Sequence, residues 1–528
     1  MIEPLKLHTP ALQLHQLPAI LMVIFIAMIY IPLILEGGIV LDDWGDIAQN
    51  LSCNGFWNCY GNWFPLFSNR PLAPLPITVS TLLFKTNVMG YLIMNTLFYL
   101  LSIYLTSKVL LKVIGKPAAY VFGCLACIPF IAMPAIVSPI NQSTATLSFL
   151  FWSSSLFLTF SYSQRGRPWK YWLSTVLLLC AFLTYEIILP LLVLNAFLPA
   201  LFYATNKKWG RLAYAIRYIL PIVVVLAITV LWQKGLAPQL MEVDSRLKFN
   251  SGEALAKIYT WAHVFFVQIP SLFFKSLTHF STLTLISSTI LGACLFFAFP
   301  RTQKLIQNKQ RIQFLILSFA TFLSSSAIFI LANESANSWG YQARGLSSTW
   351  LALAILIAAI SALITSRKSP ILWIIIIFGG FSSACFSIQR DNYIASWKLQ
   401  TLILGDALSL IKAEKVPQDA DLIGNVPKFL NPNFNDELVF SQPWDFPAAL
   451  AILSNNNIRS GAVLDSRRGD FRKIQFINNQ VRLENWSGAN ADNLWFYDFD
   501  PINRKGTLRK MHSLLELESQ IAALGYRP

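Results

Sequence analysis

Acidic residues are scarce in most of this 528-residue chain: residues 1–389 contain only ten carboxylates, and only 13% of all residues are charged. Histidine is also rare, with five residues, none of them spaced as zinc ligands. The sequence contains no P-loop, no GxSxG, no HExxH and no Rossmann fingerprint. It therefore offers no sign of P-loop or dinucleotide binding, of serine-hydrolase chemistry or of zinc-protease chemistry.

What the chain has in abundance is apolar sequence. It is 55% hydrophobic with a mean hydropathy of +0.52, and apolar runs of about 18 or more residues recur along it. This pattern predicts a polytopic α-helical membrane protein, and the length of the first run favours a retained helix over a cleaved signal peptide. We expect about eleven transmembrane helices, near residues 18–40, 88–110, 118–137, 144–162, 171–185, 187–204, 218–233, 281–299, 312–332, 346–365 and 371–388.

Lysine and arginine collect in alternate short loops, which sets the expected orientation. The basic loops should face the cytoplasm, so an N-terminus inside and eleven spans place the C-terminus outside. These loops and their attraction to anionic lipid explain the net charge of +15, so we expect a lipid bilayer as a partner and no nucleic acid. The basic loops hold Lys108, Lys112 and Lys116; Arg165, Arg167 and Lys170; Lys207, Lys208, Arg211 and Arg217; Arg301, Lys304, Lys309 and Arg311; and Arg367 and Lys368.

The chain divides into two expected parts. Residues 1–388 form a transmembrane domain with exported loops near residues 41–87 and 234–280, and residues 389–528 form an exported C-terminal domain. The second part alternates short apolar runs and is flanked by helical patterns, which predicts a small α/β or α+β domain. The apolar runs lie at 462–464, 473–477 and 493–497, and the helical patterns at 397–413 and 511–524.

Three of the ten carboxylates lie together in Asp42-Asp43-Trp44-Gly45-Asp46, directly after the first apolar run. A carboxylate near lipid is costly and usually functional. Desolvation raises its pKa, which suits proton abstraction from a sugar hydroxyl near neutral pH. Adjacent helical residues point about 100° apart, so Asp42 and Asp43 need not share one role. The alternative is a helix end whose charges face water.

Other polar residues also stand out against apolar surroundings. Arg70, after Asn69 in Asn-Arg-Pro-Leu, is either a bidentate phosphate ligand or an interfacial anchor. Glu186 is the only carboxylate between positions 47 and 241, and is either a site residue or a helix-end charge. Arg344 is the only cation of its short exported loop, close to Gln342, which favours a functional role.

Cysteine is used in two ways. Cys53 and Cys59 share the first exported loop, where an oxidising compartment would permit a disulfide, and a free pair is equally open. The other five lie in predicted spans and are expected to be small apolar core residues.

The chain resembles the GT-C superfamily of integral membrane glycosyltransferases, and among them the serotype-converting O-antigen glucosyltransferases. The resemblance rests on the Asp42-Asp43 pair after the first span, the aromatic first loop closing on Asn69-Arg70-Pro71-Leu72, the many spans and the exported C-terminal domain. It implies a multi-pass protein of a bacterial inner membrane, with a periplasmic C-terminal domain.

The resemblance also implies an activity. A sugar, glucose or another hexose, moves from a polyprenyl-phosphate donor to an exported glycan, lipid-linked glycan or lipid acceptor, with inversion. Asp42 or Asp43 takes the catalytic carboxylate role and Arg70 a substrate-binding role. Family members often carry an arginine shortly after the Asp pair, where this chain has Asp46, so Arg344 is the substitute phosphate ligand. Some members use a divalent metal, Mg²⁺ or Mn²⁺, which the carboxylates permit and do not require.

Other functions are also compatible with parts of this sequence pattern. An O-antigen polymerase or ligase also has many spans and exported loops, but acts through exported Arg and His residues. A lipid or glycan transporter usually shows internal repeats and charges within broken helices, and neither feature is evident in this sequence. A sensor or assembly protein would not require eleven spans as an anchor.

Overall fold

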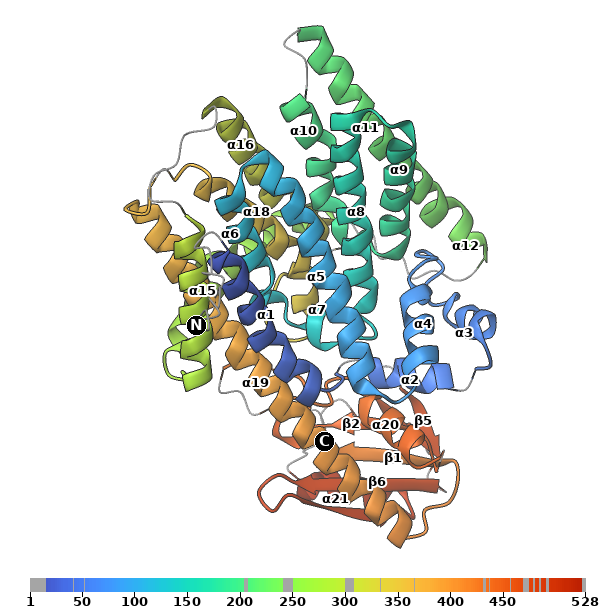
Figure 1. Ribbon diagram of the computed structural model, residues 1–528. Coiled ribbons are helices and arrows are strands. Elements are labelled where there is room, and N and C mark those ends of the chain that lie inside the picture. Colours follow the sequence, from blue (N-terminus) through green and yellow to red (C-terminus); the bar gives the residue numbers. More distant parts are fainter. Residues whose placement is uncertain are drawn as a thin grey trace, which may run out of the picture.

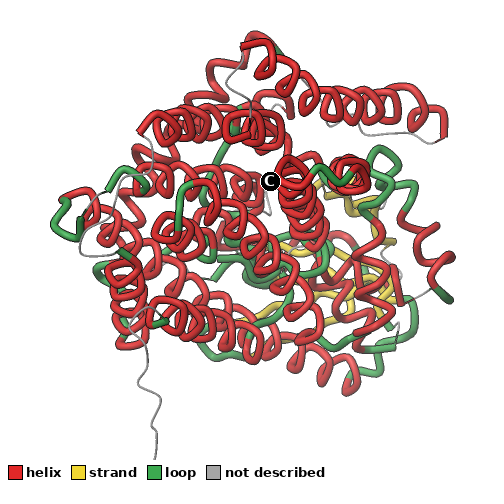
Figure 2. Tube along the Cα trace, turned by 45° about the horizontal axis from the view of Figure 1, so that its top comes forward, coloured by secondary structure: helices red, strands yellow, loops and turns green. Residues whose placement is uncertain are grey.

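The protein is mainly helical, with a small sheet domain at one end (Figure 1). This computed structural model describes residues 16–524, except residues 41, 52, 204–207, 241–249, 300–307, 333, 365, 431–433, 436, 456, 469–473, 478–479, 484–485 and 491–492. Figure 2 shows that helices make up most of the body, with the strands gathered to one side.

Six helical segments are long and apolar enough to cross a membrane among the residues described. Their length and composition fit the prediction of a multi-pass membrane protein, and the count of eleven spans stays a prediction. The six segments are Leu17–Glu36, Val88–Val113, Ile216–Leu240, Lys309–Ala332, Gln342–Ser361 and Pro370–Ala413.

The body also contains α8 (Ser143–Arg165), which is 23 residues long. Its shorter helices include α9 (Pro168–Thr184), α10 (Leu192–Tyr203), α13 (Ala254–His263), α14 (Ile269–Ser276) and α15 (Thr282–Ala298). The segment Ile216–Leu240 begins within α11 (Lys208–Val230) and continues through η3 (Leu231–Leu236) and α12 (Ala237–Leu240). The other five segments contain α1 (Leu17–Glu36), α5 (Val88–Val113), α16 (Asn308–Ser324), α17 (Ala327–Ala332), η6 (Tyr341–Leu346), α18 (Ser347–Ser361) and α19 (Pro370–Ala413).

Prolines interrupt two of the predicted spans. The run at 118–137 folds as α6 (Lys116–Ala126), η1 (Phe130–Ala132) and α7 (Pro134–Val137). The run at 187–204 begins with the 3₁₀ helix η2 (Glu186–Leu191), which contains Pro190. Proline has no backbone N–H to donate, so the α-helical ladder breaks at each of these places.

Helix α19 is 44 residues long and joins the last predicted span to the helical pattern predicted at 397–413. It runs from the helical body into the sheet domain (Figure 1) and passes through residue 388, where we expect the exported domain to begin.

A buried arginine ties α19 to α1. Pro32 lies inside α1, so the carbonyl of Met28 loses its usual helical N–H partner. Arg390 fills this position by donating from Nη1 to the Met28 carbonyl at 2.9 Å and to the Ile29 carbonyl at 3.4 Å. Its Nη2 also pairs with Asp391 at 2.6 Å. Pro32 therefore leaves the Met28 carbonyl available as an acceptor for the arginine that links the two helices.

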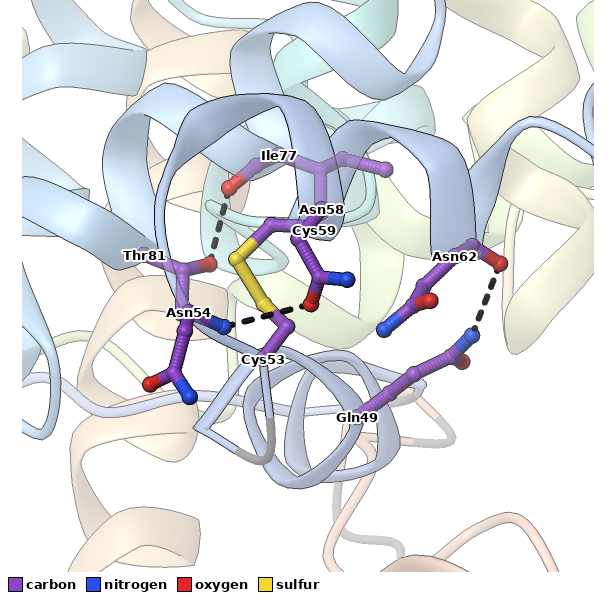
Figure 3. The surroundings of a disulfide bond; sticks show 8 residues. All are labelled: Gln49, Cys53, Asn54, Asn58, Cys59, Asn62, Ile77 and Thr81. Carbon is purple, nitrogen blue, oxygen red and sulfur yellow. Dashed lines mark hydrogen bonds between the residues drawn. A yellow bond between two sulfur atoms is a disulfide. The ribbon is translucent and has the colours of Figure 1, made fainter.

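The first predicted exported loop forms three short helices, α2 (Asp43–Leu51), α3 (Phe56–Trp63) and α4 (Pro74–Phe84). Cys53 and Cys59 form a disulfide between the end of α2 and α3, with Cα atoms 5.2 Å apart (Figure 3). Next to it, Gln49 donates from Nε2 to the Asn62 carbonyl at 3.3 Å. The loop is therefore cross-linked, and the alternative of a free cysteine pair is wrong.

The C-terminal domain contains a four-stranded sheet in the order β2-β1-β6-β7 and a separate three-stranded sheet β3-β4-β5. β1 is parallel to β2 and β6, while β7 is antiparallel to β6. The β1-α20-β2 unit makes this part α/β, and all three predicted apolar runs overlap strands. The elements are β1 (Ala420–Asn425), α20 (Asp445–Leu453), β2 (Ile458–Leu464), β3 (Ile474–Ile477), β4 (Gln480–Leu483), β5 (Trp486–Asn490), β6 (Leu494–Asp500), β7 (Lys505–Lys510) and α21 (Leu514–Ala523).

One hydrophobic core is shared between the first loop and the C-terminal domain. Ile39, Trp44 and Ile47 from the region of α2 pack in the same buried cluster as Phe446 of α20 and Tyr497 of β6. Figure 1 shows α2 lying between the helical body and α20. Helix α2 carries Asp43 and Asp46 and is called the acidic helix below. It is enclosed by the helical body on one side and by the C-terminal domain on the other.

Candidate active site

Asp43 begins helix α2 and is fully buried. Its Oδ1 accepts hydrogen bonds from the Ser138 hydroxyl at 3.0 Å and the Asn141 backbone N–H at 2.9 Å. Its Oδ2 accepts from the Val40 N–H at 3.4 Å. Three donors thus hold a carboxylate at a helix start, where the helix dipole also favours negative charge.

Burial is the strongest influence on this carboxyl group and raises the pKa of Asp43 to about 7. The hydrogen bonds from Asn141, Ser138 and Val40 act in the opposite direction, and the charge of Asp42 raises the pKa further. A carboxyl group that titrates near neutral pH can accept a proton from a substrate hydroxyl, which is what a general base requires. Asp42 itself is partly buried.

Asp46 lies one turn further along α2, and only 5% of its surface is exposed. Its Oδ2 accepts from Asn141 Nδ2 at 3.4 Å, and Asn141 Oδ1 in turn accepts from Gln142 Nε2 at 2.8 Å. Burial, and then the charges of Asp42 and Asp43, raise the pKa of Asp46 well above its usual value. Asn141 therefore connects both buried aspartates through its backbone and its side chain.

A fourth carboxyl group comes from the C-terminal domain. Asp445, the first residue of α20, is 1% exposed, and its Oδ2 accepts from the Gln442 N–H at 2.9 Å. Its Oδ1 is buried and has no hydrogen-bond partner among the described residues. Burial raises the pKa of Asp445 well above its usual value, and the charges of Asp42, Asp43 and Asp46 add to this effect. The sequence pattern gave no sign of this residue, because it lies about 400 positions from the others in a region with ordinary charge content.

Arg70 and Glu186 form a second group. Arg70 Nε lies 3.8 Å from Glu186 Oε2, and the arginine is 3% exposed. Its guanidinium carbon lies 4.7 Å from the ring centroid of Tyr185 and 5.3 Å from that of Phe67. Cation–π attraction to these two rings holds the planar guanidinium group of Arg70 in a defined position. Asn69 precedes it in the chain and is also buried.

Glu186, Gln342 and Arg344 meet at one cavity of about 480 Å³. Gln342 donates from Nε2 to Glu334 Oε2 at 3.2 Å, so a second carboxylate is held at the same cavity. The rest of the lining is largely apolar and comes from the end of α9, η2, α11, α17 and η6, including Phe182, Leu189, Leu226, Val230, Ile328 and Phe329. The cavity therefore combines a hydrocarbon-like wall with a cation and two carboxylates.

The predicted site residues thus fall into two groups. Asp42, Asp43 and Asp46 lie on or next to α2, and none of them is among the described residues that line the cavity. The segment between Pro134 and Ser148 contacts both groups. Ser138 binds Asp43, while α7 contacts η6, which carries Arg344.

The same segment reaches the cavity at its other end. Ser148 of α8 donates to the carbonyl of Tyr185 at 2.9 Å, directly before Glu186. The backbone of Leu72 also donates to the Leu183 carbonyl at 3.0 Å, which fixes the chain that carries Arg70. The segment from Pro134 to Ser148 therefore contacts Asp43 at one place and elements of the cavity at two others.

The described residues do not fit a protein-held metal ion. In the described ranges, no group of three or more His, Cys, Asp or Glu side chains is arranged to hold one. We therefore derive no step of the reaction through Mg²⁺ or Mn²⁺.

Comparison with known proteins gives distant likenesses only. No family model and no curated protein matches the chain. Among solved structures, the apo form of ArnT from Cupriavidus metallidurans matches at a TM-score of 0.36 with 16% identity, covering 92% of each chain. The same protein bound to undecaprenyl phosphate matches at a TM-score of 0.35 with 15% identity, covering 92% of this chain and 93% of that one.

Proposed function

We propose that this chain is a membrane glycosyltransferase of the GT-C type. It transfers a sugar, glucose or another hexose, from a polyprenyl-phosphate donor to an exported glycan, lipid-linked glycan or lipid acceptor. The observation that carries the proposal is the cavity of about 480 Å³, where Glu186, Gln342 and Arg344 meet an apolar wall.

The chemistry of that cavity matches a lipid-borne donor. Apolar residues of η2, α11 and α17 suit the isoprenoid chain, whose burial is favourable in proportion to its area. Arg344 supplies a cation for the phosphate, and Gln342 and Glu186 supply hydrogen-bonding groups for the sugar. Since nucleotide sugars stay in the cytoplasm, glycosyl transfer on the exported side requires a donor of this kind.

Asp43 is the proposed general base. Its carboxylate takes the proton of the acceptor hydroxyl as that oxygen forms a bond to the anomeric carbon. The bond from the anomeric carbon to the phosphate oxygen breaks, and the polyprenyl phosphate leaves with its electron pair. Arg344, with Arg70 behind Glu186, stabilises the charge that develops on the phosphate. Direct displacement of this kind inverts the anomeric configuration.

Purified full-length protein in lipid nanodiscs provides the test. Polyprenyl-phosphate glucose is supplied as the donor and O-antigen lipopolysaccharide as the acceptor, and release of polyprenyl phosphate is measured. We expect acceptor-dependent release that falls in Asp43→Asn and Arg344→Ala variants. Wild-type release rates in the variants, including Asp42→Asn combined with Asp43→Asn, would contradict the proposal. A transporter would move the lipid and leave the sugar–phosphate bond intact.

A further inference from the structure

Gln400, in the part of α19 that enters the C-terminal domain, is fully buried and makes two contacts with the start of the acidic helix. Its Oε1 accepts from the indole N–H of Trp44 at 3.2 Å, and its Nε2 donates to the Ile39 carbonyl at 3.2 Å. These two partners lie on either side of Asp42 and Asp43 in the chain. One side chain from a distant helix therefore bridges the turn that carries both carboxylates.

The surrounding aromatic residues keep this bridge in place. The rings of Trp44 and Trp397 are stacked, with centroids 6.1 Å apart and planes inclined by 25°. Trp397 also packs against Gly38 so closely that a Cβ at Gly38 would overlap its indole ring. The glycine thus allows α19 to approach the connection between α1 and α2.

The C-terminal domain covers the other face of α2. The indole of Trp444 lies against Gly45, and Asp445 follows directly, within the range of the charges of the three aspartates. Trp44 and Phe446 belong to one buried cluster. The acidic helix is therefore held between the Ser138–Asn141 turn on one side and the C-terminal domain on the other.

We propose that Gln400 is a positioning residue for the glycosyl transfer described above, and that the C-terminal domain is in this way part of the active site. The inference rests on the proposed function, because it assigns a role relative to the Asp43 carboxylate. Gln400 is not among the described residues that line the cavity. It sets the orientation of the Asp42–Asp43 turn, so that Asp43 meets its donors at Ser138 and Asn141.

A purely structural role for Gln400 makes a different prediction. It would lower stability throughout the molecule, and the turnover of the folded fraction would stay unchanged. A positioning role instead lowers kcat while the donor KM stays the same, because the cavity that binds the donor is untouched. Misplacement of a catalytic group by about 1 Å can cost roughly 100-fold in rate, so even a modest tilt of α2 should be measurable.

The experiment compares Gln400→Ala with Thr401→Ala, a matched control at the next position of α19. Thr401 is exposed and donates to the Lys398 carbonyl of its own helix at 2.9 Å. Turnover of polyprenyl-phosphate glucose and hydrogen–deuterium exchange of the peptide 39–51 are measured on the full-length protein in nanodiscs.

We expect Gln400→Ala to lower kcat about 10- to 100-fold with the donor KM within about twofold. Exchange should accelerate in residues 39–51 but not in the peptides that line the cavity, and Thr401→Ala should resemble wild type. Faster exchange with an unchanged kcat, or a KM that rises with an unchanged kcat, would overturn the inference.

Trp44→Phe gives a second test if Gln400→Ala does not accumulate. It removes the indole N–H and keeps an aromatic ring against Trp397, so kcat should fall with KM preserved. Where Gln400→Ala does accumulate and both changes act through the same hydrogen bond, the double variant should be no slower than the slower single variant. Fully additive losses would argue against the bridge. Exchange of residues 39–51 does not depend on the reaction, so it separates this inference from a failure of the proposed activity.

Discussion

The Ser138 hydroxyl donates a hydrogen bond to Asp43 Oδ1 at 3.0 Å, across 95 residues of sequence. This bond stabilises the ionised carboxylate and therefore lowers a pKa that burial raises. Burial, opposed by the hydrogen bonds from Asn141, Ser138 and Val40, places the pKa of Asp43 at about 7. The turn before α8, which carries Ser138 and Asn141, therefore contributes to the pKa of a carboxyl group on α2.

Removing that donor should shift the pH dependence of the reaction. In Ser138→Ala the ionised form of Asp43 loses one donor, so its pKa rises, by about one unit for a typical hydrogen bond. Activity should fall near pH 7 and recover above about pH 8 if Asp43 must be ionised. The measurement is kcat/KM against pH. A profile unchanged from wild type would show that this bond does not govern the base.

The two adjacent aspartates should respond in opposite ways. Asp42→Asn removes a charge that raises the pKa of Asp43, so the acid limb of the pH profile should move to lower pH while turnover persists. Asp43→Asn removes the base, and kcat should fall by about 10²- to 10⁴-fold at every pH. The pair of profiles identifies the base. The reverse result, with the large loss in Asp42→Asn, would assign the role to Asp42.

Arg344 should affect the donor more than the acceptor. Arg344→Ala removes the cation of the cavity, and Arg344→Lys keeps a charge but not the planar fork, so binding of undecaprenyl phosphate should fall strongly in the first and partly in the second. Binding is measured as the rise in the thermal unfolding midpoint of each variant in nanodiscs when undecaprenyl phosphate is added. Lys412→Ala, an exposed cation of α19, is the control. Equal shifts in all variants would place the phosphate elsewhere.

The link between α1 and α19 should be important for stability. Arg390→Met removes the donors that reach the carbonyls of Met28 and Ile29, and leaves the Met28 carbonyl, next to the Pro32 kink, without its partner. We expect a loss of about 2 kcal/mol in the free energy of unfolding. The check is the midpoint of thermal unfolding in detergent. Arg390→Lys should recover part of the loss because it retains a charged donor.

The disulfide gives a prediction that does not depend on catalysis. Cys53 and Cys59 should resist maleimide labelling until a reductant is added. Replacing both by serine should destabilise the protein by about 2 kcal/mol or less, because the closed loop is short. Mass spectrometry after alkylation, with and without reductant, decides the first point. Labelling of both residues without reductant would contradict the structure.

The parts of the site that sequence could predict share one property. Asp43, Glu186 and Arg344 are charges in a chain with few charges, and their free-energy cost in lipid made them conspicuous. Ser138, Gln400 and Asp445 are as important to the geometry, yet nothing in their own neighbourhoods marks them. Their roles depend on contacts with residues about 95 to 400 positions away, which no local pattern encodes.

The fold shows a similar division. Hydropathy located long helices such as α5 and α8 within a few residues, because their apolar length is a local property. Hydropathy predicted one span where the structure has α6, η1 and α7, because average hydropathy is insensitive to individual prolines such as Pro129 and Pro134. Hydropathy also divided α19 into a span at 371–388 and a separate helical pattern at 397–413, although residues 389–396 contain no Gly or Pro that would end a helix.

The core shared by α2 and the C-terminal domain has a consequence for how the protein is made. Trp44 leaves the ribosome about 400 residues before Phe446, which at 5–20 residues per second is a delay of roughly 20–80 s. During that interval the side of the acidic helix that packs on the C-terminal domain is uncovered, and only earlier parts of the chain, such as α4 and the disulfide, can organise the helix. Loss of the last hundred residues by truncation or a late frameshift would therefore leave the first loop permanently uncovered, and we expect such fragments to be recognised and degraded rather than to persist as partial enzymes.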